Sequence, residues 1–437
     1  GKRGWIVGGC VRDLLRSAPA KDWDVATDAR PEAVRHMFRR VIPTGLKHGT
    51  VTVLRGGEAY EVTTLRGEGA YHDGRRPAEV EFIDDIVEDL ARRDFTFNAM
   101  AIDPLERQLI DPFNGGQDLE ARLLRAVGEP AERFAEDGLR VLRGARFAAA
   151  LECTIDPATL KAMGAGQSLE TLAKVSPERV RGEWLKTMLA PKPSIGFIVM
   201  RDCQALQVIC PELMAAVGCE QNHWHSLDVW DHTMAVMDAC PPDPILRVAA
   251  LLHDIGKPGT RQRSSKTQDY TFYNHESLGA KMADRILRRL KFSNDDRQRV
   301  VDIVRHHLIC YSSDWTDAAV RRWVRRVTVE RIEDLYALSR ADGLGKGRPC
   351  DDEMTAIAEL GQRVTALMAA GTALSPKDLA VNGTLLMSEL GLEPGPIVGE
   401  LMRELVEVVT DDPTANEPAR LIEAARELVA RRQGEQP

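Results

Sequence analysis

Two aspartates separated by one residue, Asp22 and Asp24, are the first groups in this sequence that could carry out chemistry. On a β-strand, residues two apart project from the same face, so a strand here would bring both carboxylates together. The two carboxylates repel each other unless a cation lies between them. Mg²⁺ suits this position because it prefers oxygen ligands and can share phosphate oxygens. A pair of Mg²⁺ ions would activate an attacking hydroxyl group and stabilise a departing pyrophosphate. Glu61, on a later predicted strand, is our candidate for a third carboxylate.

A glycine turn precedes these carboxylates. The apolar run 5–7 ends at Gly8 and Gly9, and a helical pattern follows with Arg12 near its start. Glycine lets backbone N–H groups approach phosphate oxygens, and a following helix N-terminus adds its dipole. An arginine there can donate charge-assisted hydrogen bonds to the same phosphates. Together with the aspartates, the turn predicts a magnesium-dependent triphosphate site, although the two aspartates alone would also fit a solvated surface strand.

Histidines and aspartates form a second group with the pattern H…HD…D: His232, His253, Asp254 and Asp342. Neutral imidazole combined with carboxylate suits a divalent ion such as Mn²⁺, Ni²⁺ or Mg²⁺. Three further histidines are candidates for a second metal ion or a bound phosphate: His275, His306 and His307. The alternative is a structural helical bundle in which these histidines are incidental.

The elements that must position these groups change character along the chain. Residues 4–65 alternate between strand and helix patterns, whereas residues 132–190, 220–345 and 350–437 have mainly helical periodicity. We therefore expect an α+β protein with a small mixed head followed by an all-helical remainder. The expected divisions are 1–125 for the head, 126–215 for a neck, 216–348 for the histidine-rich metal domain and 349–437 for a tail.

Composition is that of a globular protein. The chain has 437 residues, of which 43% are hydrophobic and 28% charged, with a net charge of −8. No stretch reaches the roughly 18 uninterrupted apolar residues that a membrane-spanning helix needs, so no membrane association is expected. The eight cysteines are scattered singly without a C-x-x-C pair, which favours neither a zinc site nor disulfides and predicts a reduced, cytoplasmic location.

Several segments in order resemble class II tRNA nucleotidyltransferases and bacterial poly(A) polymerases. The first joins Val7–Asp13 to Lys21–Thr27, and the others are Arg92–Ala101, Asp111–Gly115, Glu136–Arg140 and Ser176–Val180. The resemblance spans residues 4–190 and implies a polymerase beta-like head that uses Mg²⁺, ATP, CTP and tRNA. It also implies that the second segment positions ribose and triphosphate through Arg93, Asp94 and Asn98.

The fourth segment offers a way to select a base without a template. Asp137 and Arg140 are three residues apart, which predicts neighbours on one helix face. Arginine donates and aspartate accepts hydrogen bonds, so the pair could mimic a pairing partner, as the resemblance implies for CTP and ATP. Arg143 and Arg146 continue this face and are candidates to hold phosphates or the incoming base. An ordinary i, i+3 ion pair of ~0.5 kcal/mol is the alternative.

The glycine-rich segment 67–80 is expected to form a mobile loop that reshapes the pocket between CTP and ATP. In the family that the chain resembles, enzymes that add only CC lack an intact loop here. The retained segment 68–77 therefore favours addition of CCA or of A.

The second group resembles the HD superfamily of metal-dependent phosphohydrolases. That resemblance implies phosphatase or 2′,3′-cyclic phosphodiesterase activity on tRNA ends. The tail carries no catalytic cluster, and we expect its helices to pack, to contact the tRNA elbow or to form a homodimer.

Three other functions remain open at this point. A bacterial poly(A) polymerase shares every head motif. An HD-type nucleotide phosphohydrolase with a degenerate head belongs to a different class, although Asp22, Asp24, Asp137 and Arg140 are all present. A non-catalytic RNA-binding protein would not need paired carboxylates.

Overall fold

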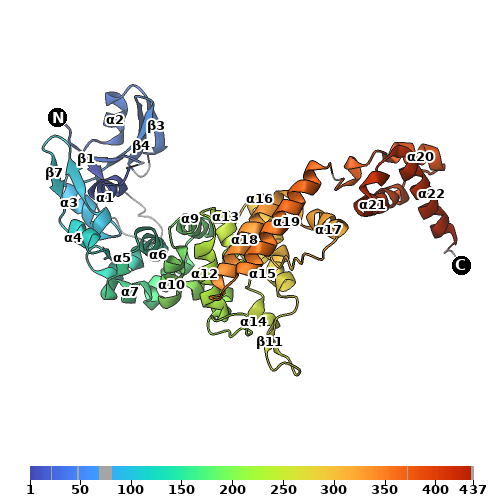
Figure 1. The fold of residues 1–437 in the computed structure, drawn as a ribbon. Helices are drawn as coiled ribbons and strands as arrows, with labels where there is room; N and C mark the ends of the chain where they lie inside the picture. Colours follow the sequence, from blue (N-terminus) through green and yellow to red (C-terminus); the bar gives the residue numbers. More distant parts are fainter. Residues whose placement is uncertain (21, 47–48, 68–80, 372, 435–437) are drawn as a thin grey trace.

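The computed structural model describes residues 1–434 except 21, 47–48, 68–80 and 372. Figure 1 shows an elongated molecule with a sheet-containing head at one end, helices through the middle and a small helical tail at the other end. This confirms the predicted α+β class. The segment expected to be a mobile loop, 67–80, lies outside the described residues apart from Gly67.

The head is built on a seven-stranded sheet with the order β3-β4-β5-β2-β1-β6-β7. All neighbouring strands are antiparallel except β2 and β5, which are parallel. The strands are β1 (Gly4–Val7), β2 (Asp24–Thr27), β3 (Val41–Gly45), β4 (Thr50–Arg55), β5 (Glu58–Thr64), β6 (Ala101–Asp103) and β7 (Gln108–Ile110). The head helices are α1 (Gly9–Leu15), α2 (Pro31–Met37), α3 (Ile86–Ala91) and the 3₁₀ turn η2 (Thr96–Asn98).

The sequence predicted β1, β2, β4 and β5 but not the short strands at the two edges. Side-chain burial alternates along β1 as expected: Trp5 and Val7 are buried, and Ile6 between them is less buried. Edge strands bury less side-chain surface, as the exposed centre of β3 shows, so their hydrophobic pattern is weak.

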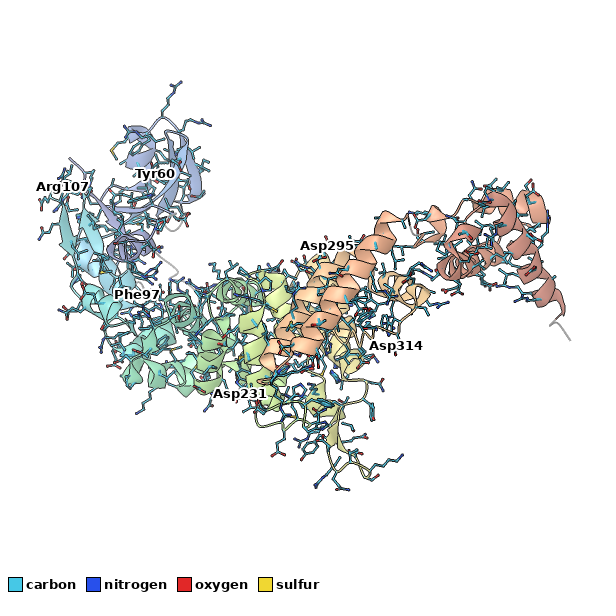
Figure 2. All side chains as sticks on the ribbon, in the orientation of Figure 1. Tyr60, Phe97, Arg107, Asp231, Asp295 and Asp314 are labelled. Carbon is cyan, nitrogen blue, oxygen red and sulfur yellow. The ribbon has the colours of Figure 1, made fainter. Side chains whose placement is uncertain are left out.

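A cluster of aromatic rings joins the head to the neck. Phe95 and Phe97 from the head pack against Phe147 of the neck, with ring centroids 5.8 and 5.5 Å away. Figure 2 labels Phe97 at this junction. The neck elements are α4 (Gly115–Glu120), β8 (Leu123–Leu124), α5 (Pro130–Glu136), α6 (Leu139–Leu151), β9 (Thr154–Ile155), α7 (Pro157–Met163), α8 (Gly166–Ala173), α9 (Pro177–Met188), α10 (Pro193–Asp202), α11 (Ala205–Ile209) and η3 (Pro211–Ala216).

The body surrounds α13, in which every residue from Ile245 to Leu252 is buried. Its elements are α12 (Val229–Ala239), α13 (Pro244–Leu252), α14 (Lys257–Thr260), β10 (Gln262–Arg263), β11 (Tyr270–Thr271), α15 (His275–Arg289), α16 (Asn294–His306), α17 (Asp317–Val327), η4 (Val329–Arg331), α18 (Ile332–Gly345) and α19 (Asp351–Ala369). The β10–β11 hairpin was not predicted, because each strand has only two residues.

One buried arginine ties the neck to the body. Arg247 of α13 donates from Nη1 to the carbonyls of Met188 and Ala190, at 2.6 and 2.7 Å, and from Nε to the carbonyl of Cys240 at 3.1 Å. Its side chain therefore caps the end of α9 while it closes the turn between α12 and α13. Buried charge requires such partners, so the end of the neck is held against the body.

The tail has a core of its own that includes Leu386, Leu405, Val406 and Leu421. It contacts the body through α17, where Arg321 donates from Nε to the carbonyl of Thr410 at 2.7 Å. The tail elements are η5 (Pro376–Asp378), α20 (Gly383–Leu390), α21 (Pro396–Asp411), η6 (Pro413–Ala415) and α22 (Pro418–Gly434). Within the described residues, no helix is long and apolar enough to span a membrane.

Candidate active site and metal centre

Three carboxylates meet beside the start of β2, an interior strand of the head sheet. The parallel register of β2 and β5 sets Asp24 opposite Glu61, and Asp22 lies in the bend just before β2. All three line one pocket of about 660 Å³. Our prediction that both aspartates lie on a strand was wrong for Asp22. Strand pairing ends at Val7 opposite Asp24, because Gly8 turns the chain with φ 79° and leaves residue 22 without a partner.

The electrostatics of this trio favour a cation. Burial raises the pKa of Asp24, Glu61 and Asp22 raise it further, and only Arg93 counteracts them. Each carboxylate offers the hard oxygen ligands that Mg²⁺ prefers, and a cation would relieve the repulsion between them. The donor set therefore fits the metal that the sequence predicts.

The glycine turn lies against the same pocket. Gly8 and Gly9 both line it, together with Arg12. A Cβ atom at Gly8 would lie 3.1 Å from Nη1 of Arg93 and 3.5 Å from a carboxylate oxygen of Asp24. With its positive φ as well, this position favours glycine.

A chain of hydrogen bonds links the predicted triphosphate residues. Arg12 donates to the side-chain oxygen of Asn98 at 2.9 Å, and the Asn98 amide donates to Asp94 at 3.1 Å. Arg143 then donates from Nε to Asp94 at 2.7 Å. Although burial opposes ionisation, Arg143 and Asn98 bring the pKa of Asp94 down to about 2. Asp94 therefore serves as a buried anion that orients the cationic wall of the pocket.

The predicted base-reading pair is not on one helix. Asp137 ends α5 in an extended conformation, and Arg140 lies in α6. The helix is interrupted at Asp137, whereas Gly138 has helical φ and ψ and begins the next helix. Gly138 packs so closely that a Cβ atom there would lie 2.2 Å from the backbone nitrogen of Leu172. The extended backbone of Asp137 removes the helical spacing between residues 137 and 140. Asp137 and Arg140 nevertheless both line the head pocket.

Asp137 and Arg140 do not form the i, i+3 ion pair that was the alternative to base recognition. Asp137 accepts from the N–H of Leu139 at 3.0 Å and from Arg179 at 2.7 Å. Arg140 bonds to the carboxylate of Glu136 and to the carbonyl of Arg92, the latter at 2.9 Å. The simple ion pair between residues 137 and 140 is therefore not the arrangement seen here.

Arg146 also lines the pocket, but buried groups constrain it. It donates from Nε to Glu183 at 2.6 Å, and its guanidinium lies 3.9 Å from the centre of the Phe147 ring. Burial lowers its pKa while Glu183 raises it. Its stacking on an aromatic ring suits a surface on which a base could lie.

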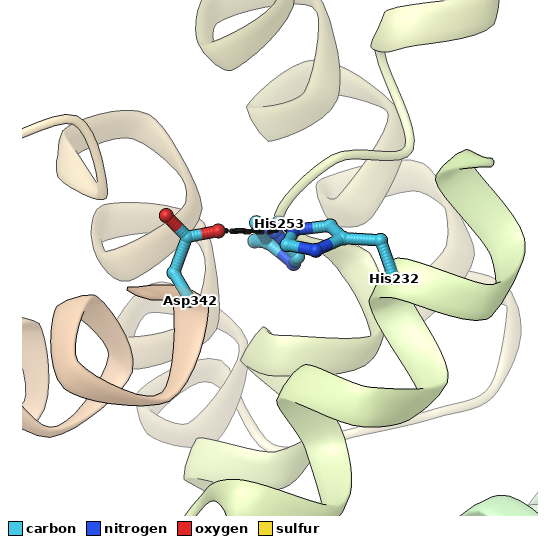
Figure 3. Close-up of side chains that lie close together, drawn as sticks. All are labelled: His232, His253 and Asp342. Carbon is cyan, nitrogen blue, oxygen red and sulfur yellow. Dashed lines mark hydrogen bonds and ion pairs between the residues drawn. The ribbon is translucent and has the colours of Figure 1, made fainter. Parts of the chain in front are cut away.

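The second predicted site assembles in the body. His232 lies on α12, His253 at the end of α13 and Asp342 on α18, and Figure 3 shows the three side chains converging. Nε2 of His232 lies 3.0 Å from Oδ1 of Asp342, and Nε2 of His253 lies 3.6 Å from the same oxygen. Asp254 completes the set, with Oδ2 3.1 Å from Nε2 of His253 and 3.5 Å from Nε2 of His232.

A second group shares Asp254. Its Oδ1 lies 3.3 Å from Nε2 of His275 and 3.7 Å from Nε2 of His307, and these three residues could hold a metal ion together. Asp254 thus faces both groups with different oxygens. The expectation that His306 belongs here was wrong: it forms no part of either group of described residues, because its neighbour His307 occupies the inward position and is buried.

All four converging histidines are oriented in the same way. The Nδ1 atoms of His232, His253, His275 and His307 lie 2.7–3.1 Å from backbone carbonyls. A carbonyl only accepts, so Nδ1 donates to it, and Nε2 is the ring atom that faces the centre and would bind a metal ion once it gives up its proton. This arrangement is typical of metal-binding histidines.

Without a metal ion, a proton at Nε2 of His253 balances the buried carboxylates. Nε2 of His253 is buried and has no hydrogen-bond partner in the described part of the chain. Burial lowers the pKa of His253, but Asp254 outweighs burial and raises that pKa to about 10. The pKa of Asp254 lies well below its ordinary value. The histidines and carboxylates therefore fit a divalent metal. They open on a pocket of about 400 Å³.

Comparison with known proteins identifies the family. Family models match residues 4–125 as "Poly A polymerase head domain", residues 153–217 as an RNA- and SrmB-binding site of polymerase A, and residues 264–425 as "tRNA nucleotidyltransferase domain 2". A CCA-adding enzyme of Streptococcus gordonii is 35% identical over 95% of this chain and 91% of its own length. The chain belongs to the CCA-adding enzyme family. A CCA-adding enzyme of Streptococcus pyogenes is 34% identical over 93% of the chain and 88% of its own length.

Solved structures agree with this membership. The Bacillus stearothermophilus CCA-adding enzyme in complex with CTP has a TM-score of 0.74 at 26% identity, covering 99% of this chain and 95% of that one. The Thermotoga maritima CCA-adding enzyme complexed with tRNA has a TM-score of 0.58 at 18% identity, covering 98% of this chain and 92% of that one. At that lower identity, the likeness shows the fold alone.

In this CCA-adding family member, sequence reasoning missed residues that support the sites. Arg179 holds Asp137 and Glu183 holds Arg146, but pairing across 42 and 37 positions leaves no local pattern. In the body, Lys257 lies 2.6 Å from Oδ2 of Asp254. Its place directly after the histidine-aspartate pair, as Ile-Gly-Lys, was the one available signal.

Proposed function

We propose that this chain adds C, C and A to the 3′ end of tRNA from CTP and ATP. The observation that carries the proposal is the convergence of Asp22, Asp24 and Glu61 with a cationic wall in one pocket. Asp22 and Asp24 would hold Mg²⁺, with Glu61 beside them. When bound, such metal ions supply activation of the attacking 3′ hydroxyl and neutralisation of the departing pyrophosphate.

The residues of the chain account for binding and orientation of the nucleotide. We assign the triphosphate to the turn at Gly8 and Gly9 and to Arg12 and Arg93, which lie around it. Asp94 and Asn98 keep the arginines in place through the hydrogen bonds described above. Because Asp94 is held in its charged form, the wall keeps its orientation without rearranging when the nucleotide arrives.

Base selection is assigned to the junction of α5 and α6. Asp137 presents an acceptor and Arg140 a donor towards the same pocket. Each is fixed by a second residue, Arg179 and Glu136 respectively, so that the edge they offer to a base is preorganised. Arg143 and Arg146 line the pocket beside them, and we assign them to the phosphates and the base.

The test is incubation with tRNA that lacks its 3′ end and with each labelled nucleoside triphosphate in turn. Ordered incorporation of C, C and A that then stops is the expected result. Long A tails on unrelated RNA would instead support a poly(A) polymerase. No incorporation from either triphosphate, with Mg²⁺ present, would refute the proposal.

A second activity, phosphoester hydrolysis in the body, is favoured by the histidine geometry. Four imidazoles with Nε2 directed at two carboxylates exceed what a structural bundle needs. His232, His253, Asp254 and Asp342 would hold one divalent ion, and Asp254, His275 and His307 a second. A bound ion would supply an activated water and neutralise phosphate charge. Lys257 and Lys346 line the adjoining pocket and suit a phosphate group.

This second activity is tested with 2′,3′-cyclic nucleotides and phosphate monoesters in the presence of Mn²⁺, Ni²⁺ or Mg²⁺. Metal-dependent release of product is expected. If no phosphate ester is opened with any of the three ions, the body site has a structural role only.

A further inference from the structure

The pocket in front of the body metal centre has an aromatic wall that the metal ligands do not explain. Three aromatic side chains other than histidines line it: Tyr270, Phe272 and Tyr273. They belong to the segment that runs from β11 into α15, and Figure 1 shows β11 below the helices of the body. The pocket has a volume of about 400 Å³, which is the size of a site for a small organic ligand.

Two of these rings are already covered. The guanidinium group of Arg261 lies 4.8 Å from the centre of the Tyr270 ring, and the Tyr270 hydroxyl group donates to Glu220 at 3.1 Å. Phe272 is buried, and Nζ of Lys257 lies 5.6 Å from the centre of its ring. These contacts hold both side chains in the wall of the pocket, so neither ring is available to a ligand.

The ring of Tyr273 is available where the other two are covered. Its side chain lines the pocket and is nevertheless 76% exposed. Within the part of the chain that the structure describes, its hydroxyl group forms no hydrogen bond and its ring lies against no other ring or cation. A tyrosine ring has a flat apolar face on which a nucleobase can stack.

A tight turn fixes this ring beside a metal-binding side chain. The carbonyl of Phe272 accepts from the backbone N–H of His275 at 3.2 Å and from its Nδ1 at 2.7 Å. Asn274 has a left-handed φ of 62°, which asparagine tolerates better than most residues. Tyr273 and His275 are two residues apart, so their Cα atoms are separated by at most roughly 7 Å. The ring and the imidazole that faces the metal centre are therefore held together.

Polar groups suited to the other parts of a nucleotide line the same pocket. Lys257 and Lys346 lie there with the metal-binding residues, and cations suit a phosphate group. The side chain of Asn274 is exposed and, among the described residues, has no hydrogen-bond partner. Its amide offers both a donor and an acceptor to a ribose hydroxyl group or to the edge of a base.

We propose that Tyr273 stacks on the base of a nucleotide whose phosphate group lies at the body metal centre. The ligand is a nucleoside with its phosphate on the ribose 2′ or 3′ oxygen, either free or at the end of an RNA. The position of the phosphate rests on the proposed phosphoester hydrolysis. The ring adds specificity, because a phosphate ester without a base gains nothing from it.

The experiment compares Tyr273→Ala and Tyr273→Phe with the control Trp224→Ala. Trp224 is also a largely exposed aromatic residue of the body, but it does not line the pocket. With the Mn²⁺-loaded chain, Tyr273→Ala should raise the KM for adenosine 2′,3′-cyclic phosphate about 10-fold and leave kcat unchanged. Tyr273→Phe and Trp224→Ala should behave like the unaltered chain.

Two further substrates test the base and its source. The KM for glycerol 2-phosphate, which has no base, should be the same in all variants. A short oligonucleotide that ends in a 2′,3′-cyclic phosphate should show the same rise in KM as the free nucleotide when the ring is removed. Whichever of the two has the lower KM in the unaltered chain identifies the source of the nucleotide.

Direct binding separates this inference from the proposed hydrolysis. Calorimetric titration with the slowly hydrolysed analogue adenosine 2′,3′-cyclic phosphorothioate should show affinity lost in Tyr273→Ala and kept in Tyr273→Phe. If the unaltered chain opens no phosphate ester but binds the analogue through Tyr273, the hydrolysis fails and the base site stands. Unchanged affinity in Tyr273→Ala, an equal loss in Tyr273→Phe, or an equal rise in KM for glycerol 2-phosphate would overturn the stacking role.

Discussion

The head pocket and the body site both gather groups suited to a divalent metal, but they do so in opposite ways. In the head, Asp22 and Glu61 are exposed, and the pKa of Asp24 is raised first by its burial and then by the charges of Glu61 and Asp22. In the body, His232 and His253 are fully buried and are oriented by backbone carbonyls. The head site is open to solvent and its carboxylates repel one another. The body site is buried, and its histidine rings are held in fixed orientations.

The contrast indicates whether each site would exchange its metal ion or keep it. A pocket of carboxylates in contact with water suits metal ions that arrive and leave with a nucleotide, because Mg²⁺ keeps part of its water shell. Buried imidazoles with fixed tautomers suit an ion that stays, because the ligands need no rearrangement to receive it.

Replacing Asp24 with asparagine should reduce nucleotide addition by about 10³-fold or more, because a metal ligand and its charge are both lost. Any hydrolysis in the body should be unchanged. Single-turnover incorporation of labelled CTP measures the effect. Asp28→Asn, outside the pocket, is the control and should retain full activity. Loss of both activities in Asp24→Asn would show that the two sites are not independent.

His253→Ala should give the reverse result. Hydrolysis of cyclic nucleotides and tightly bound metal should both be lost, whereas ordered C, C and A addition continues. Metal content after desalting, measured by mass spectrometry, and the two activity assays report this. His306→Ala is the matched control, because that histidine belongs to neither metal-binding group. Normal metal content in His253→Ala would contradict the assigned ligand set.

Brief treatment with a chelator should remove metal ions from the two sites at different rates. Nucleotide addition should stop at once and return as soon as Mg²⁺ is added back, since the head ligands are open to water. Metal in the body should leave much more slowly, since its ligands are buried. Equal rates of metal loss from the head and the body would contradict the idea that one ion exchanges and the other stays bound.

The smallest expected effect concerns Asp94, a carboxylate whose charged form is stabilised by its neighbours. The pKa of Asp94 is about 2, below the ordinary 3.8, so its charged form stabilises the fold at all pH values above the ordinary pKa. That contribution is lost as the pH falls from about 4 towards 2. Asp94→Asn should lower the free energy of unfolding by about 2 kcal/mol at pH 7, and by progressively less in that range. Urea unfolding at several pH values measures it, and a constant difference would be contrary to this account.

Local sequence patterns predicted the groups that carry chemistry better than their surroundings. The α+β layout follows from strand and helix periodicity, and the pocket around Asp24 from residues close in sequence, whereas the convergence of His232, His253, Asp254 and Asp342 was expected from the order of the four residues along the chain. Such patterns depend on local backbone geometry, which a sequence displays directly.

The errors arise where tertiary packing decides. Asp137 and Arg140 have helical spacing, but the extended backbone of Asp137 separates α5 from α6, and Gly138 packs directly against the backbone of α8. His306 and His307 are equivalent in sequence, and only the packing of α16 turns one of them inward. No pattern near Asp137 indicates that Arg179, on α9, will hold it.

The clamp formed by Arg247 has a consequence for how the molecule can bend. A swing between neck and body at the end of α9 would pull two carbonyls away from a buried guanidinium, at a cost of roughly several kcal/mol. Bending at this point is therefore disfavoured, because it would leave the guanidinium and both carbonyls without their partners.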